Sequence, residues 1–379
     1  MAENKTTVQR KGKEGKLSLS VSSNFDDERP VYIAGNFNSW QLPDERYRLQ
    51  REGKGNYRFE FDDISSLPPL LEYKYAKGDW EGRELSPYGE EVENRNVLSD
   101  IGFKAESVGR WRTQGLGYSP DFLPKIEILD ETFEIPQLIK TRRISALLPF
   151  DYETSGKNYP VLYLQDGQNL FDDYAPFGNW AIDKKLAILA EMGLGDVIII
   201  AIDHAEEDRI KEFTPSTGGN LGKGEGKKYV RFLADTLKPY VDKHFRTIPD
   251  RTHTGIGGSS MGGLISIYAG LMYPEVYGRL LIFSPSLWAA PNIHFHAINL
   301  EEAHDTRVYI YAGEGESNTM VPNIKKFQQA IQNQGSAANV EFDLSIDPHG
   351  HHNEARWGRE FPKAIAWLFF NKSSEENKA

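Results

Sequence analysis

The stretch Gly257-Gly258-Ser259-Ser260-Met261-Gly262-Gly263 decides the fold. The pattern Gly-x-Ser-x-Gly is met around Ser260, with Gly258 before it and Gly262 after it, and it fails around Ser259. On a tight turn from a strand into a helix, side chains at the two flanking positions would clash, so glycine is needed there. An apolar strand pattern precedes the motif and a helical pattern follows it. The motif therefore predicts Ser260 as an exposed nucleophile; the alternative is an ordinary glycine-rich turn.

Backbone donors for a negatively charged oxygen can be predicted at two places. Met261 opens the helix that follows the nucleophile, so its N–H would point toward the reacting carbonyl oxygen. The apolar strand Val161–Gln165 leads into Asp166-Gly167-Gln168. Glycine at that turn allows the backbone to approach a substrate closely. We assign the Gln168 N–H as the second donor, and the alternative is a plain turn between strand and helix.

A serine nucleophile also needs a histidine base, which in this chain order follows the acid. Three candidates, His349, His351 and His352, fall in one loop between the last strand and the last helix. We predict His352 as the base because it lies closest to the start of the helix. Metal binding by this histidine-rich loop is one alternative, since three histidines and an aspartate can ligate zinc, and a solvated loop without a function is the other.

The acid is expected after the strand Arg307–Tyr311, in the sequence Ala312-Gly313-Glu314-Gly315-Glu316. An acid there would hold the correct tautomer of the histidine and stabilise its protonated form. Glu316 is preferred over Glu314, while a solvated acidic loop is the alternative.

The chain divides by pattern into two regions. Residues 16–104 contain short strands in which apolar and polar residues alternate, which predicts a small all-β, immunoglobulin-like sandwich. Residues 105–124 lack periodicity and are predicted as a linker. From 125 to 371 strands alternate with helices, which predicts an α/β fold with a doubly wound, mostly parallel sheet.

Composition narrows the classes of function. The chain has 379 residues, no cysteine and a net charge of −11. The negative charge argues against a nucleic-acid partner, and the absence of cysteine excludes disulfides and thiolate metal sites. No apolar run reaches the roughly 18 residues of a membrane span. The first residues contain no apolar signal segment. We therefore expect a cytoplasmic protein, or a mature form after signal removal, without a membrane partner; the oligomeric state stays open.

Residues 125–370 resemble the α/β-hydrolases of the putative-esterase family, which includes carbohydrate esterases of family 1 and enterochelin-type siderophore esterases. The resemblance implies an α/β-hydrolase fold in which Ser260, His352 and Glu316 form a catalytic triad, although many relatives have aspartate as the acid. The matching motifs are Tyr163-Leu164-Gln165-Asp166-Gly167-Gln168, Gly258-Ser259-Ser260-Met261-Gly262-Gly263, Phe283-Ser284-Pro285-Ser286-Leu287-Trp288, Gly313-Glu314-Gly315-Glu316 and His352-Asn353-Glu354-Ala355-Arg356-Trp357.

The substrate pocket is predicted from the same resemblance. We expect Asp166, Trp180, Arg209 and Trp288 to contact the substrate; for the two tryptophans a core position is the alternative. Arg209 and Lys211 lie in the long loop 204–227 and would suit an anionic siderophore, but the net charge of −11 disfavours that substrate.

The N-terminal region is similar to family 48 carbohydrate-binding modules and to the glycogen-binding domain of AMP-activated kinase. The resemblance rests on Ala34-Gly35-Asn36-Phe37-Asn38-Ser39-Trp40, Leu71-Glu72-Tyr73-Lys74-Tyr75 and Glu93-Asn94-Arg95. Such modules stack sugar rings on exposed aromatic residues. Trp80 is the predicted platform, while Trp40 is either a core residue or a ligand contact. The alternative is a purely structural spacer.

Together these patterns predict a serine-dependent carboxylic ester hydrolase that forms an acyl-enzyme and needs no metal or organic cofactor. The expected substrate is an acyl ester of a carbohydrate or a related small ester. The alternatives are a siderophore esterase and a non-catalytic carbohydrate-binding protein.

Overall fold

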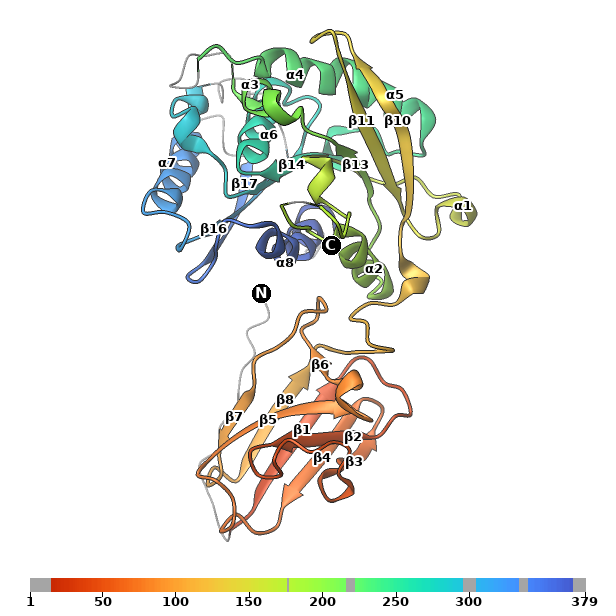
Figure 1. The fold of residues 1–379 in the computed structure, drawn as a ribbon, viewed down its shortest axis with the longest axis vertical. Coiled ribbons are helices and arrows are strands. Elements are labelled where there is room, and N and C mark those ends of the chain that lie inside the picture. Colours follow the sequence, from red (N-terminus) through yellow and green to blue (C-terminus); the bar gives the residue numbers. More distant parts are fainter. Residues whose placement is uncertain (1–14, 176, 216–221, 296–304, 334–339, 371–379) are drawn as a thin grey trace, which may run out of the picture. The chain divides into compact units, whose positions relative to one another are not determined.

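The computed structural model describes residues 15–175, 177–215, 222–295, 305–333 and 340–370 (Figure 1). The chain forms two compact units, residues 1–119 and residues 120–379, and each unit has its own apolar core. Among the helices of the described residues, none has the length and apolar composition that crossing a lipid bilayer requires.

The second unit is organised around one sheet. Its described residues form eight strands in the order β10-β11-β13-β12-β14-β15-β16-β17. The two strands β10 and β11 are antiparallel to their neighbours, and from β13 onward all pairs are parallel. The strands are β10 Lys125–Ile135, β11 Lys140–Leu148, β12 Val161–Gln165, β13 Ile198–Ile202, β14 Thr254–Ser259, β15 Arg279–Phe283, β16 Thr306–Gly313 and β17 Val340–Asp347.

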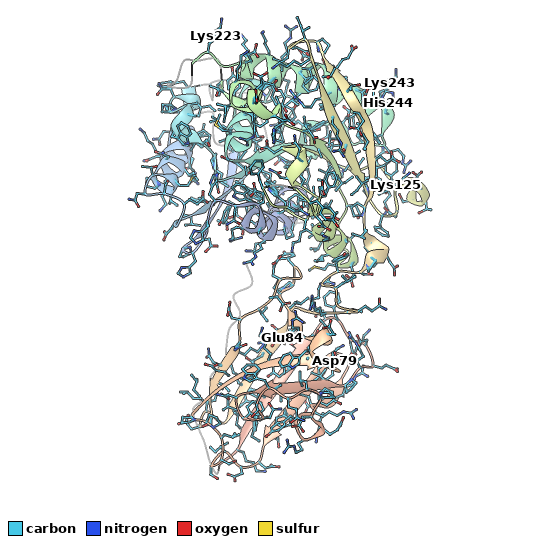
Figure 2. The ribbon with its side chains drawn as sticks, viewed as in Figure 1. Asp79, Glu84, Lys125, Lys223, Lys243 and His244 are labelled. Atoms are coloured by element: carbon cyan, nitrogen blue, oxygen red, sulfur yellow. The ribbon has the colours of Figure 1, made fainter. Side chains whose placement is uncertain are left out.

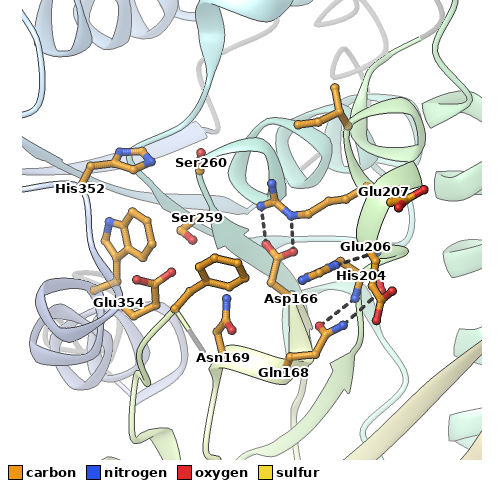
Figure 3. A pocket seen from close by; sticks show the side chains of 14 residues that line it. Asp166, Gln168, Asn169, His204, Glu206, Glu207, Ser259, Ser260, His352 and Glu354 are labelled. Atoms are coloured by element: carbon orange, nitrogen blue, oxygen red, sulfur yellow. Dashed lines mark hydrogen bonds and ion pairs between the residues drawn. The ribbon is translucent and has the colours of Figure 1, made fainter. Parts of the chain in front are cut away.

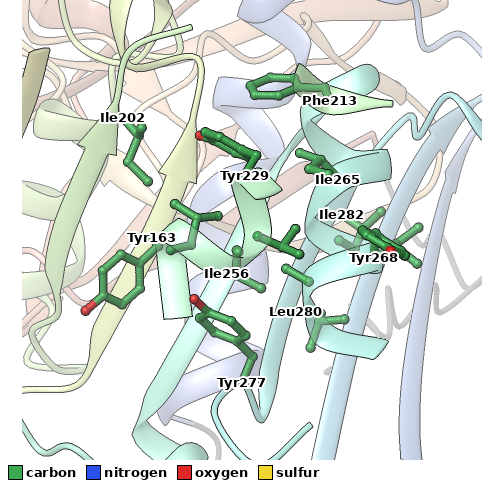
Figure 4. Packing of buried hydrophobic residues seen from close by; sticks show 14 of the residues in the cluster. Tyr163, Ile202, Phe213, Tyr229, Ile256, Ile265, Tyr268, Tyr277, Leu280 and Ile282 are labelled. Atoms are coloured by element: carbon green, nitrogen blue, oxygen red, sulfur yellow. The ribbon is translucent and has the colours of Figure 1, made fainter. Parts of the chain in front are cut away.

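Helices cover both faces of this sheet, as strand–helix alternation requires. The helices α4, α5, α6 and α7 share the main apolar core with the sheet, whereas α2 and α8 pack against each other on the opposite face. Figure 4 shows that core, where Tyr163 and Ile256 of the sheet face Tyr229 and Ile265 of the helices. The helices are α1 Tyr152–Ser155, α2 Ile182–Glu191, α3 Arg209–Phe213, α4 Gly226–Phe232, α5 Lys238–His244, α6 Met261–Met272, α7 Met320–Gln332 and α8 Glu354–Ile365.

The first unit is all-β, as the alternating pattern predicts. Two sheets, β3-β4-β1-β8 and β2-β5-β7, enclose one apolar core to which both contribute, and β6 and β9 form a third pair. A buried carboxylate, Glu84 (labelled in Figure 2), forms an ion pair with Arg95. The strands are β1 Leu17–Ser23, β2 Val31–Gly35, β3 Gln50–Gly53, β4 Asn56–Phe61, β5 Leu70–Lys77, β6 Glu84–Leu85, β7 Arg95–Leu98, β8 Phe103–Val108 and β9 Arg110–Trp111.

The prediction of a linker over residues 105–124 is wrong for its first part. Strand β8 runs to Val108 and pairs with β1, and β9 pairs with β6, so the first unit extends to residue 119. The sequence pattern hides β8 because charged residues alternate along it. Glu106 is nevertheless well buried at its side chain, where Arg95 and Lys104 neutralise it.

Candidate active site

Ser260 lies on the sharp turn between β14 and α6, with φ 55° and ψ −121°. Side chains at the flanking glycines would not fit. A Cβ on Gly258 would lie 2.9 Å from the carbonyl carbon of Gly262, and one on Gly262 would lie 2.8 Å from Oδ2 of Asp166. Both distances are shorter than real Cβ contacts. The strand–turn–helix that the motif predicts is therefore present, and it places Ser260 at the carboxyl edge of the sheet.

His352 and Glu316 are joined by a hydrogen bond of 2.7 Å between Nδ1 and Oε2. Glu316 follows β16, and its side chain is 1% exposed, whereas that of His352 is 39% exposed. Burial alone would raise the pKa of Glu316, but hydrogen bonds from His352, Ser284 and the Gly313 N–H lower it below the usual value of a glutamate. The carboxylate is thus ionised at neutral pH and accepts the Nδ1 proton, which leaves Nε2 as the basic atom of the ring.

Ser260 and His352 line the same pocket (Figure 3). In this structure the Ser260 Oγ lies 3.3 Å from the Oγ of Ser286. Hydrogen bonds between a nucleophile and its base are often loose without substrate and tighten in the complex. The shared pocket, rather than an existing Ser260–His352 bond, is what brings the two groups together.

The other candidates for the base and the acid are exposed and do not line the pocket. His349 and His351 are exposed and are not among the residues that line the pocket. Glu314 is exposed, and its backbone N–H donates to the carbonyl of Asp347. Within the described ranges, no three His, Asp or Glu side chains are grouped so that they could hold a metal ion, and the histidine loop is no exception.

The pocket has a volume of about 700 Å³ and an acidic lining. Of its described lining residues, Arg209 is the one arginine or lysine, and four are carboxylates. Burial raises the pKa of one of these, Glu354. The lining residues are Asp166, Gln168, Asn169, Phe177, His204, Glu206, Glu207, Arg209, Ile210, Ser259, Ser260, His352, Glu354 and Trp357.

The predicted substrate contacts Asp166 and Arg209 both lie in this pocket, where they form an ion pair. Arg209 donates from Nε to Oδ1 at 2.6 Å and from Nη2 to Oδ2 at 2.8 Å. Burial alone would lower the pKa of Arg209, but Asp166 raises it. Because the two charges satisfy each other in a bidentate geometry, the guanidinium is not a free anion-binding group.

Gln168 also lines the pocket, and its side chain connects two loops. Its Nε2 donates to the carbonyl of His204 at 3.1 Å, and its Oε1 accepts from the His204 N–H at 2.9 Å. This Gln168–His204 clasp holds the turn after β12, from which the second oxyanion donor is expected, against the loop after β13. Figure 3 shows both bonds as dashed lines.

The two tryptophans that were predicted as substrate contacts do not line this pocket. Trp180 is 3% exposed, stacks on Phe283 with ring centroids 5.3 Å apart, and packs against Trp357. Trp288 is 58% exposed on a turn outside the pocket lining. Trp180 is held in the core by rings of distant elements, Phe283 of β15 and Phe361 of α8, and such contacts cannot be inferred from the local sequence.

Several of the described lining residues are not predicted as site residues from the sequence, and His204 is the one among them with a titratable ring. It lies two residues after the end of β13, and the carboxyl ends of parallel strands meet at one edge of the sheet. That rule, applied to β13 as it was to β12, would have pointed to it. Its Nδ1 accepts the Glu206 N–H at 2.9 Å, so the neutral ring carries its proton on Nε2.

In the first unit, Trp40 and Trp80 form an open aromatic cleft. Their ring centroids are 6.2 Å apart at 36°, and the Trp80 Nε1 donates to the carbonyl of Trp40 at 3.3 Å. Both residues are half-buried, so Trp40 is not a core residue. Lys74, Arg83 and Asn94 complete the lining of a cleft of about 390 Å³.

The second unit is similar in sequence to known proteins. The family model described as "Putative esterase" matches residues 136–368, which is more than half of the chain. The uncharacterized protein YbbA of Bacillus subtilis is 26% identical over 244 residues, which cover 60% of this chain and 92% of YbbA.

Two further relatives have named activities. An endo-1,4-beta-xylanase/feruloyl esterase of Xylanibacter ruminicola is 25% identical over 61% of this chain, and an iron(III) salmochelin esterase of Escherichia coli is 25% identical over 56% of it. The chain spans only 30% and 51% of the length of these two proteins. The crystal structure of the enterobactin esterase FES from Shigella flexneri is similar in fold, with a TM-score of 0.50 and 14% identity over 93% of this chain and 92% of that one. The chain belongs to the putative esterase family, and it is a carboxylic ester hydrolase with an α/β-hydrolase fold.

Proposed function

We propose that this enzyme hydrolyses neutral acyl esters of carbohydrates or related polyols through a triad of Ser260, His352 and Glu316. One observation carries the proposal: a histidine that is hydrogen-bonded to a buried carboxylate lines the same pocket as a serine on a nucleophile turn. Nucleophile, base and orienting acid are the three groups that acyl transfer through a covalent intermediate requires.

The reaction follows from these positions. The Ser260 Oγ attacks the acyl carbon while the Nε2 of His352 takes its proton, and Glu316 stabilises the resulting imidazolium. The N–H groups of Met261 and Gln168 hold the oxyanion of the tetrahedral intermediate. His352 then gives the proton to the leaving alcohol, and water releases the acid by the same steps. Each step uses only side chains, backbone N–H groups and water.

The charge of the pocket supports a neutral substrate. Arg209 is neutralised by Asp166, which leaves the carboxylates of Glu206, Glu207 and Glu354 in the lining. An anionic ferric siderophore would meet like charges there, and repulsion between charges is strongest in a partly desolvated pocket. An uncharged ester, such as the feruloyl ester in the name of the Xylanibacter ruminicola relative, avoids this repulsion.

The proposal can be tested by measuring kcat/KM for p-nitrophenyl acetate, butyrate and a longer ester, a feruloylated sugar and a ferric siderophore ester. We expect the feruloylated sugar to exceed the siderophore by at least about 10-fold, equivalent to about 1.4 kcal/mol in transition-state binding. A preference for the siderophore would support the alternative esterase. No turnover of any ester would support a non-catalytic binding protein.

A second function, binding of an α-glucan by the first unit, is favoured by the paired rings of Trp40 and Trp80 beside Lys74 and Asn94. Aromatic faces with polar groups at their edges suit a sugar ring, which has an apolar face and hydroxyls around it. The alternative, a structural spacer, does not require a paired aromatic cleft open to solvent.

Trp80→Ala is expected to raise the dissociation constant for a linear malto-oligosaccharide by at least about 10-fold, because the sugar loses one aromatic face. Titration calorimetry on the full chain measures this constant. Trp288→Ala is the matched control, since it removes an exposed tryptophan of the second unit and should leave the constant as it is. Equal constants for Trp80→Ala and the unmodified chain would favour the spacer.

A further inference from the structure

We propose that Ser284 is a positioning residue of the active site, which orients the carboxylate of Glu316 toward His352 and is itself oriented by Trp357. This inference rests on the proposed triad and adds two residues that act through Glu316. Ser284 directly follows β15 and is fully buried, and it is not among the residues that line the pocket. It can therefore influence the reaction only through its neighbours.

The direction of each hydrogen bond at Ser284 follows from the chemistry of its partners. The Trp357 Nε1 lies 2.9 Å from the Ser284 Oγ, and an indole N–H can only donate, so the hydroxyl oxygen accepts. The Ser284 Oγ lies 2.7 Å from the Oε1 of Glu316, and an ionised carboxylate can only accept. The single hydroxyl proton of Ser284 is thus directed to Glu316, in a chain that runs from Trp357 through Ser284 and Glu316 to His352.

This chain divides the two carboxylate oxygens of Glu316 between separate tasks. Oε1 accepts from Ser284 and from the Gly313 N–H at 2.8 Å, whereas Oε2 accepts from His352. With two donors on Oε1, rotation of the carboxylate would break two hydrogen bonds in a buried place. Oε2 is therefore held where Nδ1 of His352 needs it, and the tautomer of the base is fixed as well.

The backbone of Ser284 shows that its side chain is needed. Its φ is +45°, a left-handed conformation that glycine adopts without strain and that other residues rarely adopt. Its N–H donates to the carbonyl of Tyr311 at 2.8 Å. Glycine would satisfy this backbone better than serine does. The presence of serine at this position is therefore explained by the hydrogen bonds of its hydroxyl and not by the backbone conformation.

The test compares Ser284→Ala with Ser284→Gly in the full chain, with p-nitrophenyl acetate as substrate. Loss of a hydrogen bond to a charged group is expected to lower kcat by about 10- to 100-fold in both variants, with little change in KM. If Ser284 had only a structural role, glycine would suit its φ and would restore kcat. Activity of Ser284→Gly within twofold of the unmodified enzyme would therefore overturn the inference.

Trp357→Phe completes the test, because it removes the indole N–H and keeps an aromatic ring. It should lower kcat severalfold in the unmodified enzyme and no further in Ser284→Ala, since interactions within one chain of groups are not additive. Equal losses in both backgrounds would show that Trp357 acts only through its ring contact with His352, and would overturn that link of the chain.

Ser260→Ala, measured in parallel, distinguishes a failure of the positioning role of Ser284 from a failure of the proposed triad. If it is inactive while the Ser284 variants keep full kcat, only the positioning role fails. If Ser260→Ala is active, the proposed triad fails and the inference fails with it. Proton NMR gives an independent measurement. The proton on Nδ1 of His352 should give a far-downfield resonance, and we expect this resonance to lose intensity in both Ser284 variants.

Discussion

Ser260→Ala is expected to lower kcat for p-nitrophenyl acetate by about 10⁴- to 10⁶-fold, the range found when the nucleophile of a catalytic triad is removed. Alanine cannot form the acyl-enzyme, so only binding and oxyanion stabilisation would remain. The φ of +55° at this position is already tolerated with a side chain, and the smaller alanine adds no clash. We therefore expect the fold to survive the substitution.

Stopped-flow kinetics measures this directly, because the unmodified enzyme should show a burst of nitrophenol that the variant lacks. The melting temperature of both proteins serves as the control, and it should agree within a few degrees. A variant that folds normally and keeps more than a tenth of the unmodified kcat would exclude Ser260 as the nucleophile.

Glu316→Gln should have the next largest effect, a loss of about 10⁴-fold in kcat, as in other triads whose acid is converted to its amide. The change is nearly isosteric, but the amide can present an N–H to His352, which favours the wrong tautomer of the ring. The buried acceptor Oε1 also serves Ser284 and Gly313, so the amide oxygen is drawn to that side. The amide nitrogen then faces Nδ1.

Glu314→Gln is the matched control, because it makes the same chemical change two residues away on an exposed side chain. We expect its kcat to stay within twofold of the unmodified value. The reverse result, with Glu314→Gln inactive and Glu316→Gln active, would make Glu314 the acid and contradict the geometry described above.

The parts of the site that could be predicted from sequence are those with a local cause. The glycines around Ser260 follow from crowding on one turn, and chain order points to a histidine after the last strand. The preference for His352 over His349 and His351, and for Glu316 over Glu314, agrees with the contacts in the structure. For the acid, the resemblance to known esterases adds support to the preference for Glu316, because local sequence separates two glutamates in one turn only weakly.

The failures have long-range causes. Strand β8 pairs with β1, which lies about 85 residues earlier in the sequence. The charged residues that alternate along β8 are typical of a surface loop, although the side chain of Glu106 is buried. Trp180 belongs to the layer of aromatic rings between β15 and α8, which depends on contacts between distant elements. His204 was overlooked because a single histidine carries no motif. The pairing of β8 and the packing of Trp180 are not encoded in a short window of residues, whereas the position of His204 near the end of β13 is the one local signal.

The Gln168–His204 clasp has a consequence for how the specificity of this enzyme can diverge. Both of its bonds use the backbone N–H and C=O of residue 204 and none uses the imidazole. Any residue with a backbone N–H can therefore occupy position 204 and keep the turn after β12 in place. The pocket wall can change its side-chain chemistry there during evolution or loop grafting, whereas an insertion or deletion before position 204 would shift the register of the clasp and disturb the catalytic machinery.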